Sequence, residues 1–538
     1  MRHLPKYIMM MAALALCSSC LDEHPRDQLS EDRVFTDEGN LYLNTVATLY
    51  NYIGGHEDSQ GLQGTSRGVY DMNTFSSDEA MLPTRGADWY DGGQWQQLYL
   101  HTWDAGFSIS NDTWKYLYKV IVLCNQSLER LDTYKHLLAD SQYDILTAEV
   151  RALRAMYYVY LLDLYGRVPY ITSTDITGQM RQLERSQLFY TLYDELRKQL
   201  PYLAYERSNV KGEYYGRMTQ PVAFFVLAKM ALNAEVWTDD VWTDDIRPDG
   251  TQIMLSITDD AKVNAWEACL YWCQKVHDVG YTLEADEFSN FAVHNSNSVE
   301  NIFTIPMDKS LYTNIFKNLF RSRHNNHAGA MGMASENGTC ATIKAVKTHG
   351  YGTDDIDPRY WGNYYSGEVY VNNQEVLLDD GTPLEYVPLG VQLDLTGTPF
   401  EKTGGARMKK YEDDLTALND GQLQDNDIVL FRLGDVVLMQ AEAMERLGMD
   451  GSYYFNLIRN RAHATPRECT LENILDERLI ELAWEGWRRQ DLIRFDQFHR
   501  PYDQRPQAPG EADRHTIVFP IPGSALSLDE GNRQNPGY

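Results

Sequence analysis

The sequence predicts a mainly α-helical protein in which paired helices support an irregular, loop-rich face. Amphipathic segments of roughly 15 to 20 residues run through 111–280 and return after residue 429. The stretch between them, 305–426, is rich in Gly, Asn, Asp and Tyr. Strand signals are limited to short alternating runs, and a chain of 538 residues is long enough to bury a large core.

The first 19 residues predict a targeting segment and no part of the fold. A positively charged start precedes an apolar run, 8–16, which is too short to span a bilayer. Ser19 then precedes Cys20, the small residue and cysteine that a lipoprotein signal peptidase requires. We therefore expect a lipoprotein signal peptide over 1–19 and an acylated Cys20 that anchors the protein to a membrane. An ordinary secretory signal followed by a chance cysteine is the alternative.

The first half of the mature chain predicts a series of amphipathic helices joined by short or moderate loops. Small residues such as Ala223, Ala228 and Ala231 would let neighbouring helices approach closely. This is the arrangement of tetratricopeptide-type helical hairpins, in which adjacent pairs bury each other's faces, although the fixed period of that repeat is missing. The predicted helices are 111–132, 148–169, 186–203, 221–237 and 262–280.

The second half predicts loops followed by more helices. Long irregular segments within a compact domain are usually functional loops, and we assign that role to 305–426. Alternation in "GEVYVN", followed by "NNQEVLLDDG", predicts a short β-hairpin there. Helices return at 429–448, 453–464 and 471–495.

Charge and composition restrict the ligand. The net charge is −29, which repels phosphate backbones and argues against nucleic acid as a partner. The chain nevertheless carries 36 Tyr and 11 Trp, so neutral ligands that stack on aromatic rings remain open. No phosphate-binding loop, nucleophile elbow or dinucleotide fingerprint is present in its proper context, and we predict no cofactor.

The loop "DWYDGGQW" places three large aromatic side chains around a Gly-Gly pair. A sugar ring has an apolar C–H face that stacks on indole or phenol rings, while its hydroxyls need planar polar partners. We expect Trp89 and Tyr90 to stack on a ligand, and Arg85 and Asp91 to hydrogen-bond it. The alternative is that the rings fold inward onto the helical core, and Trp95 fits both interpretations equally.

Five residues of the middle segment are further candidates for ligand contact. They combine aromatic rings with planar donors and acceptors that suit sugar hydroxyls. Stabilisation of the loop itself is the competing role for each of them. They are Tyr312, Arg321, His324, Asn325 and Trp361.

The run "DERLIELAWEGWRRQDLIR" is the most enzyme-like part of the chain. A glycosidase needs two carboxylates about 5 to 9.5 Å apart, and Glu477 and Glu481 stand one helical turn apart. The neighbouring arginines would keep these groups ionised and paired, which opposes general-acid catalysis. We therefore predict structural ion pairs here, and a protein that is not an enzyme.

Possible metal ligands are isolated in the sequence. Cys269 and Cys273 share one helical face, as do His324 and His327, but no further ligands stand nearby. The run 352–359 holds three aspartates without the ligand order of an EF-hand, so a calcium ion there stays an open alternative. We predict no metal site.

Several ordered motifs show a resemblance to a known family. The C-terminal half contains "RLGDVVLMQAEAMERLG", "FNLIRNRAHA", "ILDERLIELAWEGWRRQDLIRF", "FPIP" and a final "QNPGY". The N-terminal half contains "RALRAMYYVYLLDLYGRVP". In this order they closely resemble the SusD/RagB family of surface nutrient-uptake lipoproteins, and the resemblance is weakest over 305–426.

The resemblance implies a single SusD-like domain over 20–538. Its N-terminal part would span about 21–237 and its C-terminal part about 262–538, with a tetratricopeptide-like superhelix supporting an irregular ligand-binding face. It also implies a lipid-anchored protein at the outer-membrane surface that captures a glycan for a SusC-like TonB-dependent transporter. One branch of the family binds peptides, so peptide capture is an alternative, and a surface glycoside hydrolase is a weaker one.

Overall fold

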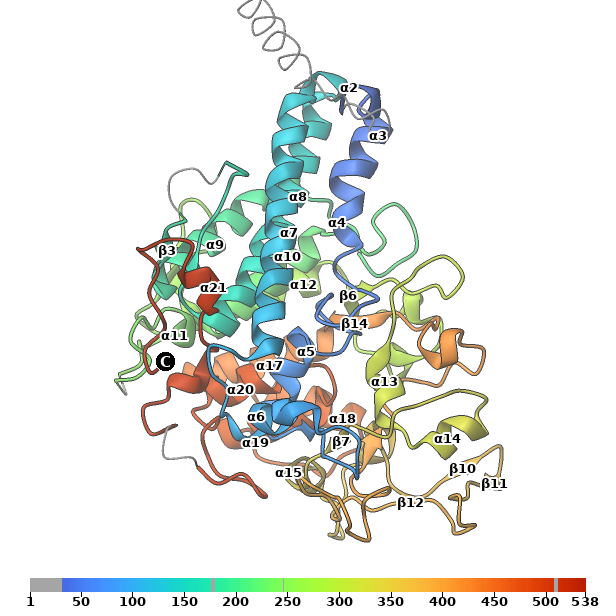
Figure 1. Cartoon of the computed structure of the whole chain (residues 1–538). Coiled ribbons are helices and arrows are strands. Elements are labelled where there is room, and N and C mark those ends of the chain that lie inside the picture. The colour runs from blue at the N-terminus through green and yellow to red at the C-terminus, as the bar shows by residue number, and fades with distance from the viewer. Residues whose placement is uncertain (1–30, 176–179, 245, 508–510) are drawn as a thin grey trace, which may run out of the picture.

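The computed structural model describes residues 31–175, 180–244, 246–507 and 511–538. The predicted signal peptide and Cys20 lie outside these residues. Helices dominate the described part of the chain, and its strands are short (Figure 1). The prediction of a mainly α-helical fold with a few short hairpins is therefore confirmed.

Long antiparallel helices form the N-terminal half. α7 (Ser108–Thr133) and α8 (Asp140–Tyr165) pack along each other, and α9 (Arg185–Gln199) packs on α8. α10 (Gln220–Leu232) is buried from Pro221 to Leu232, because its sequence is apolar on every face. α12 (Ala265–Asp278) packs against α10 and begins after Asn264, which forms a capping box with Glu267.

The C-terminal helices continue the same stack. α17 (Leu433–Arg446) packs on α12 and α18 (Ser452–Arg461) packs on α17. α19 (Leu471–Glu481) and α20 (Arg488–Arg494) follow. The two halves are joined by β6 (Asn301–Ile305) and β14 (Ile428–Arg432), an antiparallel pair that is buried along its whole length.

Two predicted helices, 221–237 and 471–495, are each two helices in the structure, and the second shows why. The chain breaks between α19 and α20, where Trp484 has a φ of 66°. At this break the carbonyl oxygen of Glu481 accepts hydrogen bonds from Arg432 and Lys410, and the amide of Trp484 donates to Glu79. Tertiary partners thus replace the helical hydrogen bonds, which local periodicity cannot reveal.

The predicted hairpin is present in the middle segment. β10 (Tyr370–Val371) pairs with β11 (Gln374–Glu375), and Asn372 and Asn373 connect them with φ values of 50° and 62°. Asparagine tolerates this left-handed region better than most residues, which suits a two-residue turn. The other strands are β1 (Ala80–Met81), β2 (Val168–Pro169), β3 (Gln182–Leu183), β4 (Met254–Ser256), β5 (Lys262–Asn264), β7 (Cys340–Ala341), β8 (Tyr364–Tyr365), β9 (Gly367–Glu368), β12 (Glu385–Tyr386) and β13 (Arg407–Met408).

Short helices fill the remaining parts of the described chain. The N-terminal ones lie along α7 and α8, and the later ones lie among the loops (Figure 1). They are α2 (Glu31–Val34), α3 (Glu38–Tyr42), α4 (Thr48–Tyr50), α5 (Val69–Phe75), α6 (Gln94–Leu100), α11 (Ala234–Trp237), α13 (Lys317–Ser322), α14 (Asn325–Ala330), α15 (Ile343–Thr348), α16 (Tyr360–Asn363) and α21 (Gly523–Leu526).

The acidic and basic residues of the C-terminal motif form buried ion pairs. Arg432, at the end of β14, contacts Glu300 at 2.8 Å, Glu481 at 2.6 Å and Glu485 at 2.8 Å. Burial alone would raise the pKa of Glu481, but Arg461, Arg432 and Arg359 hold that pKa well below its usual range. The prediction of structural pairing is confirmed, since these carboxylates are both buried and neutralised.

Candidate functional site

The loop before α6 turns sharply and presents Tyr90. Trp89 and Asp91 have φ values of 65° and 44°, and Gly92 and Gly93 continue the turn at 71° and 84°. A positive φ is costly for a bulky residue such as tryptophan, so surrounding contacts must hold Trp89 there. Tyr90 is left 60 % exposed at the outer edge of the turn.

Trp89 makes those contacts itself and fixes the loop to the middle segment. Its indole Nε1 donates a 2.9 Å hydrogen bond to the carbonyl oxygen of Glu336. Its ring lies so close to Gly338 that a Cβ on that residue would stand 2.8 Å from the indole. Trp89 is therefore half-buried between two loops that are far apart in sequence, and only part of its ring could meet a ligand.

Trp95 and Arg321 lie beneath the loop and cannot contact a ligand in this conformation. Trp95 is 1 % exposed and its Nε1 donates to Asp91 at 2.9 Å. Arg321 is fully buried, lies 5.6 Å from the Trp95 ring centroid, and contacts Asp71 at 2.6 Å. The expectation of direct contact is corrected for Arg321, and for Trp95 the anchoring alternative holds. Both side chains support the loop from the core.

Arg85 is also buried and corrects a second expectation. Its guanidinium donates to the carbonyl oxygens of Glu401 at 2.9 Å and Gly404 at 2.8 Å. These carbonyls belong to a loop without regular structure, so they need donors from elsewhere in the chain. Arg85 therefore holds two loops together, and its donors are not available to a sugar.

A polar cleft adjoins the Tyr90 loop. Its volume is about 370 Å³, within the ~300–1,000 Å³ range of ligand pockets. Arg67 contacts Asp58 on the cleft wall and Asp91 at 2.9 Å, and so joins the cleft to the loop that carries Tyr90. The lining residues are Asp58, Ser59, Gln60, Arg67, Asp112, Lys115, Tyr116 and Lys119.

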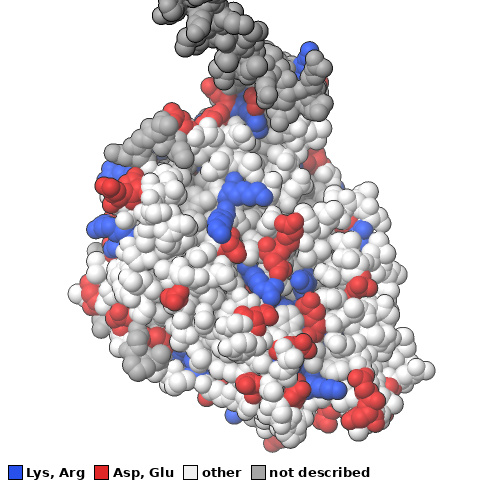
Figure 2. All heavy atoms as spheres, in the orientation of Figure 1, with Lys and Arg blue, Asp and Glu red and all other residues white. Residues whose placement is uncertain are grey.

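Both signs of charge gather around this cleft. Figure 2 shows acidic and basic side chains together down the middle of the face that α7 and the α5–α6 region occupy in Figure 1. Lys115 contacts Asp112 at 2.8 Å, whereas the Lys119 ammonium lies 4.8 Å from the centroid of the Tyr52 ring. The cleft can therefore both donate hydrogen bonds to hydroxyl groups and accept them.

Sequence reasoning missed most of the cleft. Asp112, Lys115 and Lys119 lie at i, i+3 and i+7 on the polar face of a helix that was predicted for its apolar face. Their spacing was a signal that could have found them. Asp58 and Arg67 come from a Gly-rich loop whose path depends on the rest of the fold, and they carried no such signal.

Tyr312 lies beside a different cavity. It is 43 % exposed, and its neighbours line a polar cavity of about 270 Å³. Burial raises the pKa of Asp427 in this cavity to about 6. The cavity is lined by Lys211, Tyr215, His294, Ser296, Met307, Asp308, Ser310, Leu311, Asp425 and Asp427. The segments behind the two cavities touch, because the amide of Ile315 donates to the carbonyl of Gly55 at 2.9 Å.

The last three candidates line neither cavity. His324 is buried at the start of α14, where its Nδ1 accepts from the amide of Asn326 at 3.1 Å. Burial and the nearby Arg407 lower the pKa of His324 to about 4. Asn325 is exposed beside it, and Trp361 is 52 % exposed on α16. The structure thus brings together the N-terminal loop candidates and Arg321, but not these three.

One group of side chains has metal-ligand spacing within the described residues. The nearest ligand atoms of His101, His499 and Glu511 all lie within 4.8 Å of one another. The guanidinium of Arg505, however, contacts both Glu511 and the Nδ1 of His101, the latter at 2.6 Å. A cation already occupies this position, so the group is better described as a buried polar cluster.

No helix within the described ranges combines the length and apolar character needed to cross a membrane.

Two family models match the chain. The model for the SusD family matches residues 354–538, and a model for starch-binding proteins that associate with the outer membrane matches 59–232. The chain belongs to the SusD/RagB family. The resemblance noted in the C-terminal motifs is therefore confirmed.

Curated SusD-like relatives align over most of the chain. The starch-binding protein SusD of Bacteroides thetaiotaomicron is 23 % identical over 525 residues, covering 89 % of this chain and 87 % of that protein. The SusD-like protein P25 of Formosa agariphila is 23 % identical over 589 residues, covering 99 % and 98 %. The relatives are named as binding proteins or family members, in line with the prediction that this chain is not an enzyme.

Solved SusD-like structures share the fold. A laminarin-binding SusD-like protein superposes with a TM-score of 0.69 at 19 % identity, covering 93 % of this chain and all of that chain. The surface glycan-binding protein A of Bacteroides thetaiotaomicron, in complex with laminarihexaose, gives 0.68 at 18 % identity, covering 94 % and 100 %. At this identity the likeness supports the SusD-like architecture alone.

Proposed function

We propose that this protein captures a glycan at the cell surface through Tyr90 and the adjoining cleft, and delivers it to a SusC-like TonB-dependent transporter. The observation that carries the proposal is the exposed ring of Tyr90, which lies beside a polar cleft on a loop that Trp89 fixes in a strained conformation. Family membership and the glycan-binding names of its relatives support the same function. Substrate turnover is not part of it.

The chemistry of the cleft suits a sugar. The phenol ring of Tyr90 can cover the apolar C–H face of one sugar unit, which removes that face from water. The cleft lined by Asp58, Gln60 and Lys119 then offers acceptors and donors for the hydroxyl groups. Because Trp89 fixes the loop before binding, little conformational entropy has to be lost when the ligand arrives.

The place where the described chain begins is consistent with a surface role. The described chain begins at α2, which lies at the opposite end of the molecule from α14 and the β10–β12 loops (Figure 1). We propose that acylated Cys20 attaches the protein to the outer membrane at the α2 end. The loop-rich segment would then extend away from the attachment point.

The test is glycan binding by the mature protein and by Tyr90→Ala. Titration against a panel of plant, host and microbial polysaccharides should find a ligand, and Tyr90→Ala should bind it at least about tenfold more weakly, a loss of roughly 1.4 kcal/mol. Tyr453→Ala is the matched control, since Tyr453 is 69 % exposed on α18. It should bind as the wild type does.

Other outcomes would select another function. Release of shorter sugars from the bound polysaccharide would establish a glycoside hydrolase. Binding of peptides but of no glycan would establish peptide capture. If a glycan binds and Tyr90→Ala does not weaken it, the site is elsewhere on the molecule, with the Tyr312 cavity as the next candidate.

A further inference from the structure

A fully buried arginine has no hydrogen-bond or ion-pair partner in the described part of the chain. Arg185, the first residue of α9, is 0 % exposed. None of its three guanidinium nitrogens has a hydrogen-bond partner among the described residues, and none lies within ion-pair distance of a carboxylate there. Arg321 and Arg494, which are buried to the same degree, contact carboxylates at 2.6 Å. Arg185 therefore needs an acceptor that the described chain does not supply.

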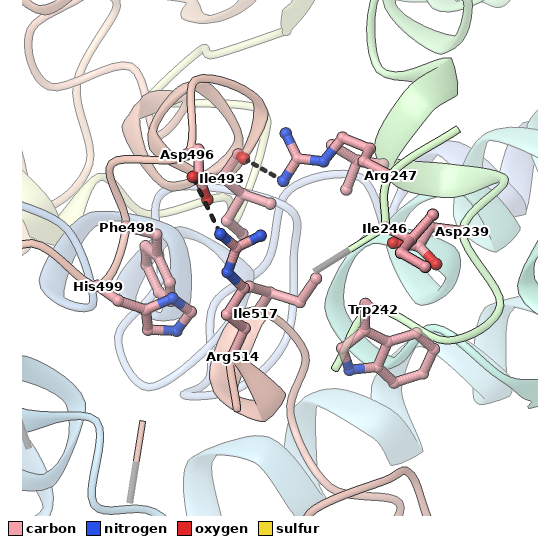
Figure 3. A pocket seen from close by; sticks show the side chains of 11 residues that line it. Asp239, Trp242, Ile246, Arg247, Ile493, Asp496, Phe498, His499, Arg514 and Ile517 are labelled. Carbon is pink, nitrogen blue, oxygen red and sulfur yellow. Dashed lines mark hydrogen bonds and ion pairs between the residues drawn. The ribbon is translucent and has the colours of Figure 1, made fainter. Parts of the chain in front are cut away.

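A second unsatisfied donor lies next to it. The Arg185 guanidinium carbon stands 5.5 Å from the centroid of the Trp242 ring, and the buried Nε1 of Trp242 has no hydrogen-bond partner among the described residues. Figure 3 shows Trp242 at the edge of a small cavity with Asp239 and Arg247. Two buried donors without acceptors thus lie next to each other, and Trp242 is the one that lines the cavity.

The carboxylates nearest to Arg185 do not form an ion pair with it. Asp163 accepts a 2.9 Å hydrogen bond from Arg489, which uses much of its capacity. Asp239 is a second nearby carboxylate, and burial raises its pKa, which favours its neutral form. Arg247 adds a third guanidinium, which donates to two backbone carbonyls on α20. Burial lowers the pKa of Arg185 to about 10, so it stays charged at neutral pH.

We infer that Arg185 and Trp242 bind one small monovalent anion, such as a halide. An anion there would pair with the charge of Arg185 and accept a hydrogen bond from the Trp242 indole at the same time. A buried cation without any acceptor is strongly unfavourable, which makes an acceptor necessary. The centre of a water-sized sphere can occupy about 10 Å³ of the cavity that Trp242 lines, which leaves room for a single small species. Sulfate, phosphate and sugars are too large for it.

Thermal unfolding of the mature protein tests the site. Sodium chloride and sodium gluconate would be compared at equal ionic strength, because gluconate is too large for the cavity. Each tenfold increase of chloride above its dissociation constant should raise Tm by about 1 °C in a chain of this size, and gluconate should not. A crystal grown with bromide should show an anomalous peak within hydrogen-bonding distance of Arg185.

Variants distinguish an anion site from a structural role. Arg185→Met should abolish the chloride-dependent rise in Tm, and Trp242→Phe, a milder change, should reduce it. Trp272→Phe is the matched control, because its indole already donates to Tyr193 at 2.7 Å; it should lower Tm in both salts and keep the chloride increment. Equal Tm values in the two salts, or no bromide peak, would overturn the inference and leave water as the acceptor.

Discussion

Buried arginines stabilise two regions of this molecule in different ways. In the helical scaffold, Arg432 contacts three carboxylates, and Arg494 likewise contacts Glu442 and Asp491. In the loop-rich face, Arg85 and Arg407 contact backbone carbonyl oxygens and no carboxylate among the described residues. Arg432 and Arg494 thus pair charge with charge, whereas Arg85 and Arg407 use their charge to hold irregular backbone.

The difference reflects what each region must bury. Helices satisfy their own backbone groups, so their buried side chains are free to pair with one another. Loops leave carbonyl oxygens without partners, and an arginine with five donors can satisfy several of them at once. We expect the scaffold pairs to determine global stability, and the loop contacts to determine the shape of the binding face.

The largest effect should come from the scaffold. Arg432→Met removes the shared partner of Glu300, Glu481 and Glu485 and leaves buried carboxylates short of positive charge. Breaking a buried pair in this way costs about 3–5 kcal/mol, measured as the free energy of unfolding in urea. Arg533→Met is the control, since Arg533 is 68 % exposed and pairs with Glu184 at the surface, where such pairs contribute about 0–1 kcal/mol. Equal losses for the two variants would contradict this view of the scaffold.

The loop arginine should give a smaller and more local effect. Arg85→Met removes the donors to Glu401 and Gly404 but leaves no buried carboxylate behind. We expect a loss of about 2 kcal/mol, the usual range for hydrogen bonds to charged groups. Hydrogen exchange should accelerate in the 400–405 loop and stay unchanged in α17. Uniform acceleration across both segments would mean that Arg85 acts on global stability instead.

The same contrast explains how much could be predicted from sequence. Helical periodicity located the helices of the scaffold, and the alternation of Glu477 and Glu481 with neighbouring arginines was enough to predict ion pairing. Tyr90 could be chosen because large aromatics around a Gly-Gly pair are hard to bury together. The local pattern could not show that Arg85 and Arg321 face inward, because their acceptors come from residues more than 200 positions away.

The Trp89–Gly338 contact offers the smallest change in stability and the clearest separation of shape from stability. Gly338→Ala places a Cβ 2.8 Å from the Trp89 indole, so the ring must move away from the backbone it covers. We expect a loss of about 1 kcal/mol in unfolding free energy from this local overpacking. Glycan affinity should fall further than that, because the Trp89 hydrogen bond to Glu336 holds the turn that presents Tyr90.

Gly329→Ala is the matched control for this change. Gly329 lies on α14, and a Cβ there would meet nothing within 4 Å. It should leave both stability and glycan affinity at wild-type values. If Gly338→Ala binds glycan as the wild type does while its Trp89 ring is displaced, then the loop does not need the Trp89 contact, and Asp91 positions Tyr90 through its contacts with Arg67 and Trp95. A double variant with Asp91→Ala would then lose the affinity that the single variant keeps, because the contact between Arg67 and Asp91 is the remaining link between the loop and the cleft.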